Sequence, residues 1–285
     1  MFEKVHEIIK TEGFEGLVVR GFKKIHRYIA RHYYKKEVKL NSIFLSQDTH
    51  KCSGYRRKIN FKALGLEGKG ELLLNPLDQG LSKQLYLYGF HEPLNTIMIY
   101  ETVKKWKPII LDVGSNLGYF PSIELEAGAR YVTAIEPVPE NFYFLKKNLS
   151  KYSNVMLLDI AVSDKPGLLT LYLSDHYNLT SGDYQTIKYF SNVLGKVKII
   201  KPITVKAETI VNLVHQISER GNVMIRMDIE GFEYKVLSNK IPEKVNLLAL
   251  ELHLIPPYNI THAAVLLKKL ETENFRVISL VKELE

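Results

Sequence analysis

The pattern of apolar and polar positions becomes regular from about residue 94 and predicts helices that alternate with strands. Apolar residues at helical spacing predict helices over residues 94–105, 119–127, 139–150, 208–218 and 261–272. Short apolar runs predict strands over residues 109–111, 131–135, 155–160, 198–205, 223–229, 245–253 and 275–281. This alternation is typical of a mostly parallel sheet with helices on both faces. We therefore expect an α/β, Rossmann-like fold with a seven-stranded sheet.

The alternation breaks after residue 160. Residues 168–173 predict an added strand, and the stretch 174–196 that follows is polar and rich in tyrosine. A structureless stretch of this length inside a domain is uncommon unless it is a lid or a binding loop. We expect it to be either such a loop or a surface insertion packed on the edge of the sheet.

The N-terminal part of the chain carries the basic character. Residues 1–70 contain 16 Lys and Arg against 7 Asp and Glu, while the net charge of the whole chain is +8. Within the first 40 residues an apolar stripe recurs at helical spacing, formed by Val18, Phe22, Ile25 and Ile29. We therefore divide the chain into a basic extension, residues 1–75, and a main domain, residues 76–285.

The extension has several interpretations. An amphipathic helix of this kind suits the anionic, inner face of a membrane, but its stripe equally suits packing on the protein's own body or on a second subunit in a homo-oligomer. Its basic and aromatic residues also suit nucleic acid. Met1–Glu7 lacks the apolar core of a signal peptide, and Cys52, the single cysteine, excludes an internal disulfide and a thiolate zinc site. We expect a cytoplasmic protein.

A glycine-bearing turn follows the first regular strand, as Asp112-Val-Gly-Ser-Asn-Leu-Gly118. Gly114 permits a sharp turn, Gly118 lets the next helix pack closely on the strand, and we expect the N–H groups of the turn to face an anion. The spacing differs from the G-x-G-x-x-G of dinucleotide enzymes. Asp112 would repel a pyrophosphate, whereas it suits the amino group of S-adenosylmethionine. The turn therefore favours S-adenosylmethionine over a dinucleotide.

Acidic residues at the ends of the next two strands support the same cofactor. Glu136 stands where a carboxylate accepts both ribose hydroxyls, and Asp159 to Ala161 stand where an adenine ring is expected. We expect the cofactor to contact Asp112, Gly114, Ser115, Asn116, Gly118, Glu136, Pro137, Asp159, Ile160, Ala161 and Asp228.

Two later strands become charged at their carboxyl ends, where open α/β sheets bind ligands. Arg226, Asp228 and Glu230 alternate and so project to one side of their strand, and Glu251 and His253 do the same on the next. Ionisable groups gathered in this way indicate a reaction centre. We expect Asp228 to be the general base, with Glu230 beside it and His253, as a neutral imidazole, the alternative base.

Structural roles for the same residues stay open. Arg226 would pair with Asp228 or Glu230 as a buried ion pair, and Glu230 or Glu233 would cap the helix that starts near residue 231. Asp228, Glu230 and Glu251 together would also hold Mg²⁺, although we expect metal-free transfer.

These residues resemble the FkbM-type methyltransferases. The resemblance covers residues 85–255 and is carried by residues 89–93, 110–119, 134–141, 148, 161–164, 167, 204–210, 226–233 and 250–253. Two departures are Arg226, where the family usually has lysine, and Ala207-Glu208, where it usually has Leu-Asp.

The resemblance implies a class I methyltransferase fold that uses S-adenosylmethionine to methylate hydroxyl groups, often on sugars or glycosylated small molecules. Two other functions stay open. The basic extension would suit an RNA methyltransferase, and a non-catalytic adaptor would keep the fold without the reaction.

Overall fold

A computed structural model of the chain describes residues 55–78, 80–174, 180–194 and 199–276. The amphipathic helix expected within the first 40 residues lies outside these ranges, as does most of the strand expected at 275–281. None of the helices among the described residues is both long and apolar enough to cross a bilayer.

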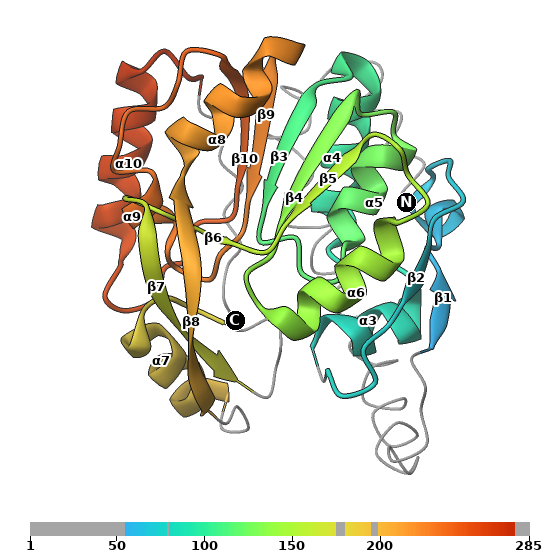
Figure 1. Cartoon of the computed structure of the whole chain (residues 1–285), viewed down its shortest axis with the longest axis horizontal. Coiled ribbons are helices and arrows are strands. Elements are labelled where there is room, and N and C mark those ends of the chain that lie inside the picture. Colours follow the sequence, from blue (N-terminus) through green and yellow to red (C-terminus); the bar gives the residue numbers. More distant parts are fainter. Residues whose placement is uncertain (1–54, 79, 175–179, 195–198, 277–285) are drawn as a thin grey trace.

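A five-stranded parallel sheet forms the centre of the protein, in the order β10-β9-β3-β4-β5 (Figure 1). Its strands are β3 (Ile109–Val113), β4 (Tyr131–Ile135), β5 (Val155–Leu158), β9 (Val223–Met227) and β10 (Val245–Leu250). All five lie within strands that the apolar runs predict or extend them by two residues. Chain order reverses at β3, which pairs with β4 on one side and β9 on the other. A reversal of this kind is where open α/β sheets bind ligands.

Helices cover both faces of the sheet (Figure 1). One face carries α4 (Pro93–Trp106), α5 (Tyr119–Glu126) and α6 (Pro139–Leu149), and the other carries α8 (Ile210–Ile217), α9 (Glu233–Val236) and α10 (Ile260–Thr272).

Successive side chains of a strand point to opposite faces, so each strand contributes to two cores. Ile110 belongs to the core beneath α4 to α6, while Ile109 and Leu111 belong to the core beneath α8 to α10. Burial on both sides explains why these strands are continuous apolar runs.

The seven-stranded sheet is not confirmed, because the remaining described strands form separate sheets. β6 (Ala161–Ser163), β8 (Ile199–Thr209) and β7 (Gly167–Ser174) make a mixed three-stranded sheet, with β8 between the other two. The run predicted as one strand at 155–160 ends at Leu158, and the chain leaves the central sheet before β6 starts.

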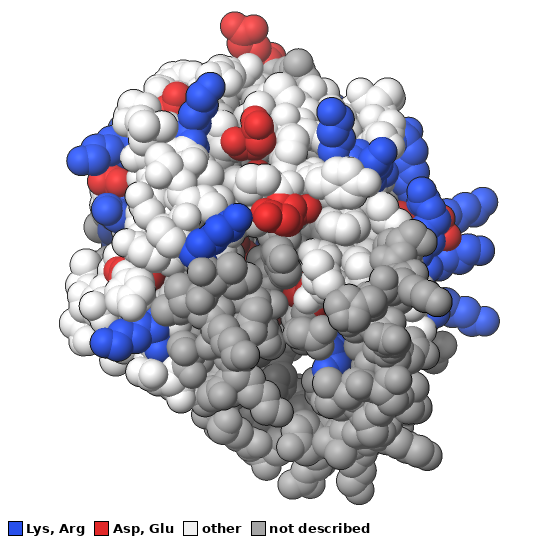
Figure 2. Space-filling view, turned by 60° about the horizontal axis from the view of Figure 1, so that its bottom comes forward, with Lys and Arg blue, Asp and Glu red and all other residues white. Residues whose placement is uncertain are grey.

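The described end of the basic segment packs into the main body. It contains β1 (Arg56–Lys58), the short 3-10 helix η2 (Phe61–Leu64) and β2 (Glu71–Leu73), followed by α3 (Leu81–Tyr88). Its apolar side chains share one core with α4 to α6, among them Ile59, Phe61, Leu64, Leu72 and Leu74. All three residues of β1 are exposed, and Lys and Arg gather on this side of the molecule (Figure 2).

Candidate active site

The residues that directly follow the five central strands lie along one edge of the sheet. Val113 is in register with Ile135 and Met227, which in turn are in register with Leu158 and Leu250. The residues that follow these strand ends are therefore neighbours along one edge, in the spatial order Asp159, Glu136, Gly114, Asp228 and Glu251. The sheet thus presents four carboxylates with a glycine at their centre, where the chain order reverses.

The glycine turn contacts the backbone directly after β9, the neighbouring strand in the sheet. Gly114 has φ +85°, and a Cβ atom on it would lie 2.0 Å from the carbonyl oxygen of Asp228. A Cβ on Gly118 would lie 3.0 Å from Leu145 in α6. The close approach at Gly114 confirms its sharp turn and brings the turn into direct contact with Asp228, whereas Gly118 makes room for α6 instead of for the strand.

The N–H groups of the turn do not face an anion, which corrects the expectation from the sequence. Gly114 and Ser115 both donate to the carbonyl of Ile135, at 3.1 and 2.9 Å, and the N–H of Asn116 donates to Glu136 Oε2 at 2.8 Å. The N–H groups of Leu117 and Gly118 also donate within the turn. Because all five donors are satisfied by the protein, the turn is not a phosphate cradle.

The carboxylate of Glu136 holds the turn by accepting backbone hydrogen bonds. Its Oε1 accepts the N–H of Val138 at 2.9 Å, and its other oxygen accepts Asn116. Burial raises the pKa of Glu136 from 4.5 to about 7, although these hydrogen bonds and one from Asn141 act in the opposite direction. The carboxylate is only 5% exposed. Its contact with a ribose stays a prediction.

Asp112 has a different environment from the one expected. It is fully buried at the end of β3, where it accepts the hydroxyl of Ser115 at 2.5 Å and lies 3.8 Å from Arg226. Its contact with the amino group of a bound cofactor stays a prediction. In the structure, Asp112 supports the turn and the guanidinium.

Arg226 joins the turn to the reaction centre. Its Nη2 donates to Asp228 Oδ2 at 2.9 Å, its Nη1 donates to the carbonyl of Gly114 at 3.2 Å, and its guanidinium lies 4.0 Å from the centre of the Phe120 ring. Burial favours the neutral form, but Asp112 and Asp228 outweigh it and raise the pKa of Arg226. The buried pair of Arg226 with Asp228, one of the structural alternatives, is therefore confirmed.

Two carboxylates near Arg226 escaped the sequence analysis. Glu124 is fully buried in α5, and burial together with the nearby charge of Asp112 raises its pKa well above the ordinary value. Glu92 interacts electrostatically with the same guanidinium. Glu92 belongs to a motif that the resemblance had singled out, whereas the helical pattern around Glu124 carries no comparable signal.

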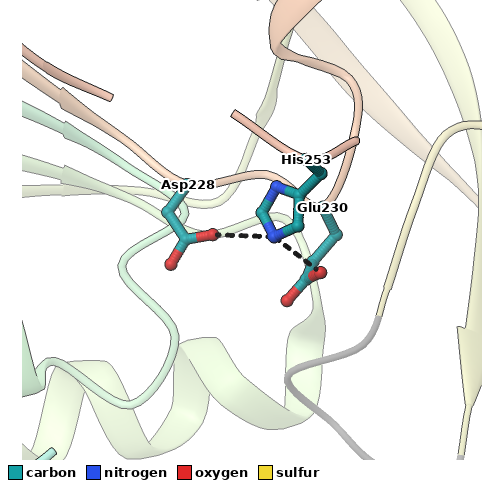
Figure 3. Close-up of side chains that lie close together, drawn as sticks. All are labelled: Asp228, Glu230 and His253. Carbon is teal, nitrogen blue, oxygen red and sulfur yellow. Dashed lines mark ion pairs between the residues drawn. The ribbon is translucent and has the colours of Figure 1, made fainter. Parts of the chain in front are cut away.

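Asp228, Glu230 and His253 form a close cluster beside the turn (Figure 3). His253 Nε2 lies 3.2 Å from Glu230 Oε2 and 4.0 Å from Asp228 Oδ1, and its Nδ1 lies 3.1 Å from Glu233 Oε1. Left-handed φ angles at Glu230 (+54°) and Gly231 (+89°) turn the chain directly after β9. The turn places the two glutamates on the two nitrogens of one imidazole.

The carboxyl groups around His253 favour its charged form over the neutral ring that the sequence suggested. Burial favours the neutral ring, but Glu230, Glu233 and Asp228 stabilise the imidazolium and raise the pKa of His253 to about 11. Glu233 also accepts the N–H groups of Ile229 and Gly231, at 2.9 and 3.3 Å, so it holds the turn before α9 and does not cap the helix as one alternative expected. Of the two candidate bases, the geometry favours Asp228.

The remaining predicted cofactor residues lie along the same edge. Pro137 is half-buried next to Glu136, Asp159 is exposed after β5, and Ile160 and Ala161 lead into β6. Glu251 follows β10, and its N–H donates to the carbonyl of Met227 at 3.0 Å.

The polar stretch near residues 174–196 is not a long loop. Within it, α7 (Tyr184–Leu194) is a helix, and residues 175–179 and 195–196 lie outside the described residues. Thr186 donates to the carbonyl of Pro256 at 3.3 Å, and a Cβ on Gly182 would lie 2.9 Å from the Phe232 ring. The start of α7 therefore packs beside the loop that carries Glu230.

Residues 112–277 match the family model described as the methyltransferase FkbM domain, which is more than half of the chain. The chain belongs to the FkbM methyltransferase family. It thus carries an S-adenosylmethionine-dependent methyltransferase domain, and the match to the family model begins at Asp112 in the glycine turn.

One similar solved structure is the crystal structure of the SAM-dependent methyltransferase from Agrobacterium tumefaciens, with 9% sequence identity and a TM-score of 0.26. The similarity covers 56% of this chain and 37% of that one. No curated protein matches the chain.

Proposed function

We propose that this FkbM-family protein transfers a methyl group from S-adenosylmethionine to a hydroxyl group of a sugar, a glycan or a glycosylated small molecule. The position of Asp228 carries the proposal. Its backbone touches the glycine turn at Gly114, and its carboxylate reaches the cluster at the ends of β9 and β10. A proton acceptor thus stands directly beside the cofactor turn.

The charges around the turn fit a cationic cofactor. Six carboxyl groups stand here, namely Asp112, Glu124, Asp228, Glu230, Glu233 and Glu251, against the guanidinium of Arg226 and the ring of His253. Burial raises the pKa of Asp112, Glu124 and Glu230, and a bound cation would favour their ionised forms. When bound, S-adenosylmethionine supplies a methyl group already activated on a positive sulfonium. The turn with Glu136 and residues 159–161 would hold it, and the satisfied N–H groups of the turn argue against a pyrophosphate in the same place.

Asp228 would take the proton of the acceptor hydroxyl. Arg226 holds Oδ2, so the carboxylate has a fixed orientation, and Oδ1 is directed toward the cluster. Stacking of the guanidinium on Phe120 fixes Arg226 in turn. Because the methyl donor is already activated, alignment and removal of this proton are the main tasks left to the protein.

The acceptor class rests on the motif resemblance and is supported by the surroundings of α7. Tyr184 at the start of this helix is 45% exposed, and its ring lies 5.2 Å from that of Tyr172. Exposed tyrosines combine an apolar face with a hydroxyl group, which suits a sugar ring. The start of α7 also packs against the loop that carries the cluster.

Mass spectrometry of methylated material tests the proposal. Cells that lack the gene would be complemented with the wild-type protein or with Asp228→Asn and fed methyl-labelled methionine. We expect labelled methyl groups on carbohydrate hydroxyls only with the wild-type protein. Label on RNA, or on nitrogen atoms, would overturn the acceptor class.

Calorimetry with the purified protein supplies the cofactor control. Both proteins should bind S-adenosylmethionine, since Asp228→Asn keeps the turn intact. Failure of the wild-type protein to bind it would leave a non-catalytic adaptor as the interpretation.

A further inference from the structure

Three side chains at the ends of β9 and β10 are arranged as ligands of a metal ion. Asp228, Glu230 and His253 each offer one ligand atom, and these atoms all lie within 4.8 Å of one another. Figure 3 shows the imidazole between the two carboxylates, with Nε2 directed at both. Neighbouring ligands of an octahedral ion stand about 3 Å apart and opposite ligands about 4 Å, so small side-chain movements suffice to surround one ion.

The second nitrogen of the same imidazole is held as in metal sites. His253 Nδ1 lies 3.1 Å from Glu233 Oε1, which is fully buried and fixed by the N–H groups of Ile229 and Gly231. A histidine that binds a metal almost always donates its other N–H to a carboxylate, a backbone carbonyl or water, and this contact points the ligating nitrogen at the ion. Glu233 thus orients His253 Nε2 toward Asp228 and Glu230.

The carboxyl groups around the cluster also favour a cation. Asp228, Glu230 and Glu233 each bring a carboxyl oxygen within 4.0 Å of the ring of His253, and the Oε2 atom of Glu233 is buried without a hydrogen-bond partner among the described residues. Arg226 neutralises Asp228 from the far side, but it is shared with Asp112. Buried carboxylates are stable only when they are paired or bind a metal.

We propose that Asp228, Glu230 and His253 bind a divalent cation of the Mn²⁺ or Mg²⁺ type through Oδ1, Oε2 and Nε2. Two carboxylate oxygens favour such hard ions, and one imidazole nitrogen favours Mn²⁺ between them. Glu251, which the sequence suggested as the third ligand, is replaced by His253.

Three protein ligands leave coordination positions open for the acceptor. Two adjacent hydroxyl oxygens of a sugar fit two such positions, so the ion would select a vicinal diol and lower the pKa of the bound hydroxyl. With the ion bound, Asp228 Oδ1 is a ligand and Oδ2 is held by Arg226, so Asp228 would act through the ion and the hydroxyl proton would pass to water. This role of the ion rests on the proposed function, whereas its binding does not.

Binding of Mn²⁺ alone to the chelator-treated, full-length protein tests the site without any cofactor or acceptor. Electron paramagnetic resonance of free Mn²⁺ should show one saturable ion per chain. Glu230→Gln and His253→Gln should each weaken binding by at least about tenfold. Glu243→Gln is the matched control, because this carboxylate is 91% exposed and pairs with Lys240 at 3.7 Å; it should bind like the wild type.

A spectroscopic signature identifies the histidine. The spin echo of bound Mn²⁺ should be modulated by a directly coordinated nitrogen in the wild-type protein, and His253→Gln should lose this modulation. Far-UV circular dichroism checks the fold, and Glu230→Asp, which keeps the charge but withdraws the ligand atom, replaces Glu230→Gln if that variant unfolds.

The site is overturned by absence of saturable binding at millimolar Mn²⁺, by unchanged binding in the ligand variants, or by bound Mn²⁺ without nitrogen coupling. Failure of the proposed function is distinguishable from these results. Methyl transfer to carbohydrate that persists in a chelator would exclude a role of the ion in the reaction and would leave the proposed function intact. Tight Mn²⁺ binding by a protein that methylates RNA would support the metal site and overturn the proposed function.

Discussion

Replacing Gly114 with alanine places a methyl group on the contact between the glycine turn and Asp228. The new Cβ would lie 2.0 Å from the carbonyl oxygen of Asp228, whereas real Cβ atoms stay beyond 3.0 Å. The backbone at Asp228 must therefore move by about 1 Å. Because Arg226 donates to the Gly114 carbonyl and to Asp228, the displacement also disturbs the base and its partner.

The magnitude follows from two separate costs. An L side chain at a positive φ costs about 1–2 kcal/mol, and forcing an extra methyl into a packed site costs about 1–3 kcal/mol more. Gly128→Ala is the matched control, since Gly128 has φ +93° but no atom within 4 Å of its Cβ position. The difference in unfolding free energy between the two variants therefore measures the overlap alone, and we expect about 1–3 kcal/mol.

Urea denaturation and steady-state methyl transfer provide the assays. Gly114→Ala should lower turnover by about 10²-fold, since a shift of 1 Å at a reacting group has effects of this size, while Gly128→Ala should keep wild-type turnover. Equal stability and equal turnover of the two variants would refute the claim that the turn and Asp228 are in contact.

Three further predictions concern the carboxylates. Asp228→Asn should preserve S-adenosylmethionine binding and lower turnover by about 10²–10⁴-fold; near-normal turnover would exclude Asp228 as the base. Glu233→Ala should lower the unfolding free energy by about 2–4 kcal/mol in urea, because it leaves the buried N–H groups of Ile229 and Gly231 without an acceptor; wild-type stability would contradict this role. Burial raises the pKa of Glu136 from 4.5 to about 7, so the cofactor-free folded protein holds a proton that the unfolded chain releases. Its stability should therefore fall by up to about 3 kcal/mol as pH rises through that interval, and Glu136→Gln should flatten the slope. An unchanged slope in Glu136→Gln would contradict this assignment.

The sequence by itself determined the order of helices and strands in the central domain. The strand at 131–135 and the helix at 139–149 have the expected positions, because their apolar periodicity is a local property of the chain. It also indicated the polar residues near the carboxyl end of each strand, although β3, β5, β9 and β10 end two or three residues from the expected positions. Since parallel strands end at one edge, the sequence places Glu136 and Asp228 beside the glycine turn.

Contacts between distant segments were decided only by the tertiary structure. Arg226 donates to the carbonyl of Gly114 across 112 residues, and the Phe120 ring that stacks on it comes from a third element. The burial of Glu124 depends on how α5 packs, and no spacing in the sequence encodes it.

The charge of His253 was decided in the same way. A histidine at a strand end is neutral near pH 7 by its ordinary pKa, and only the approach of Glu230 and Glu233 to its two nitrogens makes it a cation. Likewise, the N–H groups of the turn were expected to face an anion, yet Ile135 and Glu136 on β4 and its following loop accept three of them. Local pattern predicts where an element lies, but protonation and hydrogen bonding depend on which groups the fold brings within a few ångströms.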